Sequence, residues 1–144
     1  MKTRYSALVS VKKNSMQRSE LTLGVANANL KSALDALESS YKELSKITTP
    51  SSGSMPEFLS SRMLLDAQRE LIEHNKEWVQ FAQQEITEAK ERLKLDTLEY
   101  EKFNYLELQE VENELRKQKQ LESKDLDEVA LMTYDRQRYI KRVS

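Results

Sequence analysis

The sequence contains no cysteine, only two glycines, two prolines and a single histidine among its 144 residues. Without cysteine the chain has no disulfide, no thiolate nucleophile and no cysteine metal ligand, and it fits a reducing compartment. Two glycines and two prolines cannot supply the turns of a sandwich, a barrel or a doubly wound sheet, which recur every ten residues or so. We therefore expect long helices and an all-α fold class.

The composition also limits the core. Apolar residues make up 38% of the chain and charged residues 33%, against roughly 45–50% and ~25% in ordinary globular domains. A core of many layers is not expected. The sequence shows no run of about 18 apolar residues and no secretory leader with a cleavage site, so we expect a cytoplasmic protein.

Both prolines and one glycine lie within nine residues, TTPSSGSMP at 48–56. Pro50 disfavours a helical Thr49, and Gly53 allows the chain to reverse. Ser54 and Glu57 have the spacing of a capping box, with Pro56 in the first turn. We predict a loop over 48–54 between a first helix over about 3–47 and a second over about 55–140, forming one unit over 1–144.

Apolar residues repeat every seven positions on both sides of this break. The first row is Val9, Met16, Leu23, Leu30, Leu37 and Leu44, and the second is Leu65, Ile72, Val79, Ile86, Leu93 and Tyr100. We expect Leu34 and Tyr41 to fill the companion positions of the first row, with Ala26, Ala33 and Ile47 flanking the same side. Such rows are typical of a coiled coil. They predict a long two-helix antiparallel coiled-coil hairpin.

The predicted helices differ in length, so the second one should overhang. With a turn centred near residue 51, the numbers of facing residues add up to about 103, which places Tyr5 near Leu98. Residues 1–18 carry five basic side chains and no acid, and they face the acidic segment 85–101 in this register. Everything beyond Asn104 then has no partner. The apolar residues of this C-terminal part require either an oligomer or a partner protein.

Residues that carry chemistry are scarce. His74 is the only histidine and lies away from the predicted seam, so no catalytic triad can form around it. The acidic residues between Glu85 and Glu114 lack the glycine-containing loop that folds carboxylates around a cation. Gly24 and Gly53 stand alone, so there is no phosphate-binding loop. We expect no catalytic, cofactor-binding or metal-binding residues and a protein that is not an enzyme.

Four segments of the chain resemble the FliJ family of flagellar export proteins. They are RYSALVSVKK, ALESSYKEL, EYEKFNYLELQEVE and the near-terminal KDLDEVALM, and the resemblance covers nearly the whole chain. It implies a coiled-coil stalk of type III secretion, similar to the rotor stalk of rotary ATPases, that binds and activates the ring of the export ATPase. It also implies contacts with the membrane export gate and with export chaperones, and a peripheral place at the cytoplasmic face of the inner membrane at the flagellar base. Because the net charge is only -1, we expect no nucleic-acid partner.

Two sets of residues are candidate contacts. Leu126, Val129 and Ala130 share a helix face at i, i+3 and i+4, with a basic tip of Arg136, Arg138, Lys141 and Arg142 just beyond. The resemblance implies that this segment and the paired end near the N-terminus together contact the ATPase ring. The resemblance implies an export-gate contact on the loop-proximal half, which here includes Leu37, Tyr41, Leu64, Leu71 and Trp78. Which end of the hairpin enters the ring is open at this point.

Two other classes remain. A structural or tethering coiled coil without an ATPase partner would form a stable homo-oligomer and leave nucleotide hydrolysis unchanged. A holdase chaperone of the prefoldin type normally carries a strand hairpin between its helices, and residues 48–54 are too few to make one.

Overall fold

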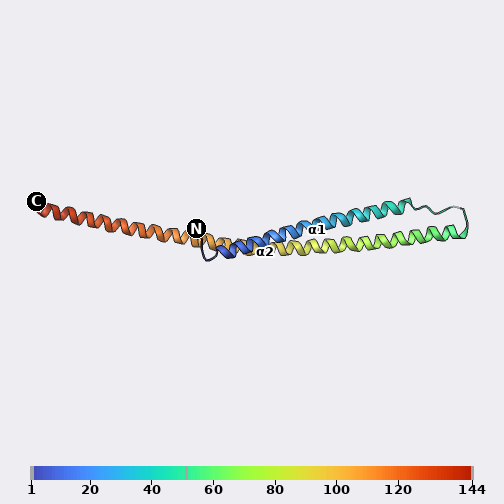
Figure 1. The fold of residues 1–144 in the computed structure, drawn as a ribbon, viewed down its shortest axis with the longest axis horizontal. Coiled ribbons are helices and arrows are strands. Elements are labelled where there is room, and N and C mark those ends of the chain that lie inside the picture. Colours follow the sequence, from blue (N-terminus) through green and yellow to red (C-terminus); the bar gives the residue numbers. More distant parts are fainter. Residues whose placement is uncertain (1, 51, 144) are drawn as a thin grey trace. The chain divides into compact units, whose positions relative to one another are not determined.

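The computed structural model describes residues 2–50 and 52–143, which form two helices, α1 (Ser6–Lys46) and α2 (Met55–Val143). The predicted all-α hairpin is confirmed: no strand occurs in the described residues, and α1 packs against α2 (Figure 1). Contacts divide the chain into two units that we describe separately. The loop unit is Lys13–Leu98, and the terminal unit consists of the described residues of Met1–Lys12 and Glu99–Ser144.

The seam of the loop unit is built around small side chains. The buried residues of α1 are Ser19, Ala26, Ala33 and Ser40, seven apart, and they face Ile72, Asn75, Val79, Ala82 and Ala89 of α2. Ala33 is 0% exposed and forms the central cluster with Val79 and Ala82, against which Leu30 and Leu37 pack. Because alanine projects only a methyl group, the two backbones approach closely here, and the flanking leucines cover the contact from the side.

The sequence prediction for the companion row of α1 was wrong. Leu34 and Tyr41 are 46% and 45% exposed, whereas the buried row runs through Ala33 and Ser40, one residue earlier. The buried positions lie three residues after Leu30 and Leu37, and a side chain four residues after them turns toward the flank of the seam. The predicted row of α2 is confirmed, because Ile72 and Val79 are buried and its other members are half-buried.

Polar residues lie in the seam of the loop unit at both ends of the row of alanines. The Asn75 amide donates to Ser40 Oγ at 2.9 Å and to the Ala36 carbonyl at 3.3 Å, and the Gln68 amide donates to the Ser40 carbonyl at 2.9 Å. At the other end, the Ser19 hydroxyl donates to the Asp96 carboxylate. Buried polar groups that find partners in only one alignment fix the register of a helix pair.

That register differs from the predicted one. The numbers of Ser40 and Asn75 add up to 115, as do those of Ser19 and Asp96, instead of about 103. Residues 47–50 follow α1 outside any helix, and an extended residue advances ~3.3 Å where a helical one advances ~1.5 Å. This segment therefore runs beside several turns of α2. The expected pivot near residue 51 lies outside the described residues.

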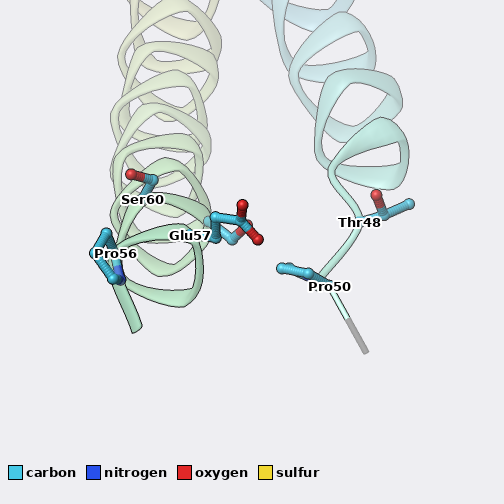
Figure 2. Close-up of a pocket in the computed structure, with 6 residues that line it drawn as sticks. Thr48, Pro50, Pro56, Glu57 and Ser60 are labelled. Atoms are coloured by element: carbon cyan, nitrogen blue, oxygen red, sulfur yellow. The ribbon is translucent and has the colours of Figure 1, made fainter. Parts of the chain in front are cut away.

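Figure 2 shows how this segment meets the start of α2. Thr48 and Pro50 lie opposite Pro56, Glu57 and Ser60, and these side chains line a shallow pocket between the loop and the helix. The amides of Glu57 and Phe58 donate to the Ser54 carbonyl at 3.1 and 3.3 Å. The two side-chain bonds of the expected capping box are not formed by Ser54 and Glu57, so this prediction was wrong.

Glycine is required next to this helix start. Gly53 has a φ of 153°, a backbone conformation that residues with a Cβ rarely adopt. The flexible Glu57 side chain lies over this glycine, so the backbone conformation is the reason that this position favours glycine.

The terminal unit pairs the basic N-terminal residues with the acidic middle of α2. Arg4 binds Glu110 at 3.0 Å and the Ser6 hydroxyl donates to Glu107 at 2.8 Å. Lys12 lies 3.6 Å from Glu99 and 5.8 Å from the centre of the Phe103 ring. The hydrogen bond to Glu110 raises the pKa of the exposed Arg4, so its charge persists at every ordinary pH.

The predicted boundary of the overhang is corrected by these contacts. The predicted pairing of Tyr5 with Leu98 was wrong. Its neighbours Ser6 and Arg4 pair with Glu107 and Glu110, which lie nine and twelve residues after Leu98 in the sequence. From Glu112 to Arg142 every residue is exposed. The wholly exposed part of α2 thus begins about eight residues later than the sequence register predicts.

The first testable prediction concerns the small residues of the seam. Ala33→Leu should lower the free energy of unfolding by about 1–3 kcal/mol, because no space remains beside Val79 and Ala82. Leu34→Ala, the adjacent exposed position, should change it by less than ~1 kcal/mol. Urea unfolding followed by circular dichroism measures both, and a larger effect at Leu34 would contradict the seam described here.

The second prediction concerns the polar contact between Asn75 and Ser40. Asn75→Ala removes two hydrogen bonds to α1 and should destabilise the hairpin by about 1–2 kcal/mol. A double-mutant cycle with Ser40→Ala should give a coupling energy of about 0.5–1.5 kcal/mol. Gln80→Ala on the exposed side of α2 is the control. Additive effects of the two substitutions would show that the pair does not contribute to the seam.

Candidate interaction surfaces

The C-terminal segment, residues 112–142, is a continuous part of α2 in which every residue is exposed. It lacks glycine and proline and carries an intrahelical ion pair between Arg116 and Glu112 at 3.3 Å, both of which favour a solvated helix. Its exposed large apolar residues are Leu115, Leu121, Leu126, Val129, Leu131, Met132, Tyr134, Tyr139 and Ile140. Such a concentration of apolar side chains is typical of a binding surface.

Helix geometry divides the residues predicted for ring contact between two faces. Leu126, Val129 and Ala130 share one face, and Arg136 lies two turns beyond Val129 on the same face. Val129, Met132, Thr133, Asp135 and Arg136 line a shallow depression there. At 100° per residue, Arg138 and Arg142 come out on the side of the helix opposite Val129.

The residues predicted for export-gate contact also do not form one surface. Leu37 is half-buried and packs against the central cluster of the seam. Tyr41 is exposed beside Lys76, and these two residues face each other across one flank. Trp78 comes only two residues after Lys76, so it lies on the other side of α2.

The first flank, which we name the Tyr41 flank, consists of Leu34, Leu37 and Tyr41 with Lys76. Leu34, Leu37 and Tyr41 line a groove along α1 with Glu38, Lys42 and Ser45. A hydrogen bond from Lys76 to Glu73 at 3.2 Å, and then the Tyr41 hydroxyl, raise the pKa of Lys76 above its ordinary 10.5. The cation therefore stays in place at neutral pH and loses its charge only as the pH rises past this raised pKa.

The second flank, which we name the Trp78 flank, is a row on α2. Leu64, Leu71 and Trp78 are seven apart and are 60%, 46% and 39% exposed. His74 and Phe81 join Trp78 in lining a shallow pocket. The sequence reasoning missed His74 and Phe81, although the 3-4 spacing of residues 64, 67, 71, 74, 78 and 81 beside the seam row is a detectable signal.

The described residues contain little that resembles a catalytic or metal centre. His74 is exposed and lies with Glu77, Trp78 and Phe81. Within residues 2–50 and 52–143 no group of three or more histidines, cysteines or acidic residues is placed to hold a metal ion. Neither described helix has a stretch long and apolar enough to cross a membrane.

These features define a class of protein, a two-helix coiled-coil hairpin whose second helix ends in a long exposed segment. The family model described as Flagellar FliJ protein matches residues 1–139, so the chain belongs to the FliJ family and is a component of flagellar protein export. The family resemblance predicted from the sequence is thereby confirmed. No curated protein and no solved structure gave a significant match.

Proposed function

We propose that the chain is a non-enzymatic stalk of the flagellar export apparatus whose C-terminal segment binds and activates the ring of the export ATPase. The observation that carries this proposal is the uninterrupted exposure of residues 112–142 on one helix. At ~1.5 Å per residue this segment is about 46 Å long. A helix of that length with exposed leucine, valine and methionine side chains requires a partner that covers it.

The distribution of charge supports a partner that encloses the helix. Arg136 lies on the face of Val129, whereas Arg138 and Arg142 lie on the opposite side. A flat partner would contact only one of these faces, but the lumen of a ring surrounds a helix on all sides. Apolar contacts then supply affinity, and the basic tip supplies steering toward an acidic lumen.

Activation follows from differential binding. A ring that closes around the stalk gains contacts which an open or incomplete ring does not make, so the stalk shifts the population toward the assembled state. Because hydrolysis belongs to that state, ATP turnover rises without any catalytic group on the stalk.

The loop unit supports a second role in the same apparatus. Its Tyr41 flank and Trp78 flank lie on different sides of the seam, so two partners can bind without overlap. We assign these flanks to the membrane export gate and the export chaperones. Binding to the gate would hold the chain peripherally at the inner membrane of the flagellar base.

The third prediction tests the ring contact. A chain that ends after Lys124 should remain folded, because the seam and Glu110, which pairs with Arg4 near the N-terminus, are untouched, but it should no longer stimulate the purified export ATPase. Arg136→Glu with Arg138→Glu should weaken stimulation mainly at low salt, where screening is least.

The matched control for this assay is Lys31→Glu with Lys90→Glu, which reverses two exposed charges of the loop unit, outside the C-terminal segment and both flanks. This control should stimulate ATP turnover like the unaltered chain. Equal stimulation by the intact and truncated chains would place the ring contact elsewhere, most directly on the loop unit.

The fourth prediction separates the two flanks. Trp78→Ala should weaken binding of one partner, either the soluble part of the gate or an export chaperone, by roughly 10-fold or more. This is the effect expected of an aromatic side chain that becomes buried in the interface. Binding of the other partner should be unchanged. Tyr41→Ala should show the reverse selectivity, and Leu21→Ala, at an exposed leucine outside both flanks, should affect neither. Calorimetric titration measures each affinity. If each variant lost affinity for both partners to the same extent, the two flanks would act as one site.

A further inference from the structure

The charges of the C-terminal segment are separated into two blocks around an apolar centre. Residues 122–128, the acidic block, contain four acids and one lysine, and residues 136–142, the basic block, contain four cations and no acid. Val129 and Met132 lie between the blocks and are 58% and 72% exposed. The acidic block ends at Glu128, next to Val129, and the basic block begins at Arg136, four residues after Met132.

We propose that two copies of the chain pair through their C-terminal segments as an antiparallel helix pair. In this pair, Val129 packs against the partner's Met132, and Met132 against the partner's Val129. The next layers outward set Asp125 against the partner's Arg136 and Glu122 against the partner's Tyr139. These positions follow the 3-4 spacing of a coiled-coil seam on one face of α2.

The charge blocks determine the direction of pairing. In the antiparallel arrangement residues 122–125 of the acidic block lie along the partner's residues 136–139, so Asp125 faces the partner's Arg136 at both ends of the pair. A parallel arrangement would place acid against acid and base against base, which disfavours it by a similar amount. A second copy of the chain carries the same acidic and basic blocks, so a two-fold symmetric pair places opposite charges together at both ends. An unrelated partner need not have this pattern of charge.

The size of the contact makes the pair reversible. Residues 122–142 span about 30 Å of helix, and only the central layer is wholly apolar. Such a contact falls in the class of weak interfaces below about 1,200 Å². We expect a dissociation constant in the range of roughly 10 to 300 μM. The inference does not depend on the ATPase ring, because it concerns the isolated chain.

Sedimentation equilibrium of the full chain tests the pairing. The unaltered protein should dimerise with rising concentration. Asp125→Arg alone places two arginines against each other at both ends, and Arg136→Asp alone does the same with two aspartates, so each variant should dimerise roughly 10- to 30-fold more weakly. An equimolar mixture of the two variants restores both ion pairs and should dimerise like the unaltered chain.

The mixture distinguishes pairing from damage to the fold, because a misfolded variant would not recover. Lys117→Asp, at an exposed lysine outside both blocks, is the control and should dimerise normally. A chain that stays monomeric up to about 1 mM would overturn the proposal, as would a mixture that does not recover.

Introduced cysteines test the direction, and the chain has no natural cysteine to interfere. Met132→Cys should form a disulfide under oxidation, because the two copies of this residue lie within one helical turn of each other. Glu122→Cys alone should not, because its copies lie about 25 Å apart along the pair. A mixture of Glu122→Cys and Tyr139→Cys should form a disulfide between the two variants. Cross-linking of Glu122→Cys with itself would show a parallel pair and overturn the antiparallel one.

Discussion

The close approach of α1 and α2 at their alanines is the constraint on which the rest of the fold depends. Ala33 is wholly buried against Val79 and Ala82, and only small side chains let two backbones come this near. The leucines of α1 are thereby moved to the edges of the seam, where they are half-buried. The larger residues beyond them, among them Tyr41 and Trp78, are left on two exposed flanks.

Register connects this seam to the exposed surfaces. In the loop unit, Asn75 finds Ser40 and Asp96 finds Ser19 in a single alignment. In the terminal unit, Arg4 pairs with Glu110, so the paired part of α2 ends there and the exposed segment begins at Glu112. A seam shifted by one heptad would break the buried hydrogen bonds and change which residues of α2 have a partner.

The sequence predicted the two helices, the break and the buried row of α2, because periodicity and helix breakers act locally. For α1 it placed Ala26 and Ala33 on the side of the seam but assigned the companion positions to Leu34 and Tyr41, because large side chains are a more conspicuous signal than the small residues that are buried. Nor did it predict the register, which depends on how far residues 47–50 extend rather than on their number.

For the candidate surfaces, the sequence shows the exposed apolar and basic residue types. The placement of Lys76 and Trp78 on opposite sides of α2 became clear only once the seam was known. The family is shown by the match over residues 1–139, while the ring, gate and chaperone contacts remain proposals.

The proposed ring contact and the proposed antiparallel pair would use the same side chains, so they would exclude each other. Val129, Met132 and Arg136 could not pack against a second copy while they lie inside a ring. A weak homodimer gives way to a ring whose subunits contact several faces of the helix at once, because those contacts act together and raise the effective affinity. Free stalk would then keep its apolar segment covered at high concentration and expose it when a ring is present. The separation of acidic and basic blocks, which a stalk of uniform charge would lack, is what allows one helix to serve both partners.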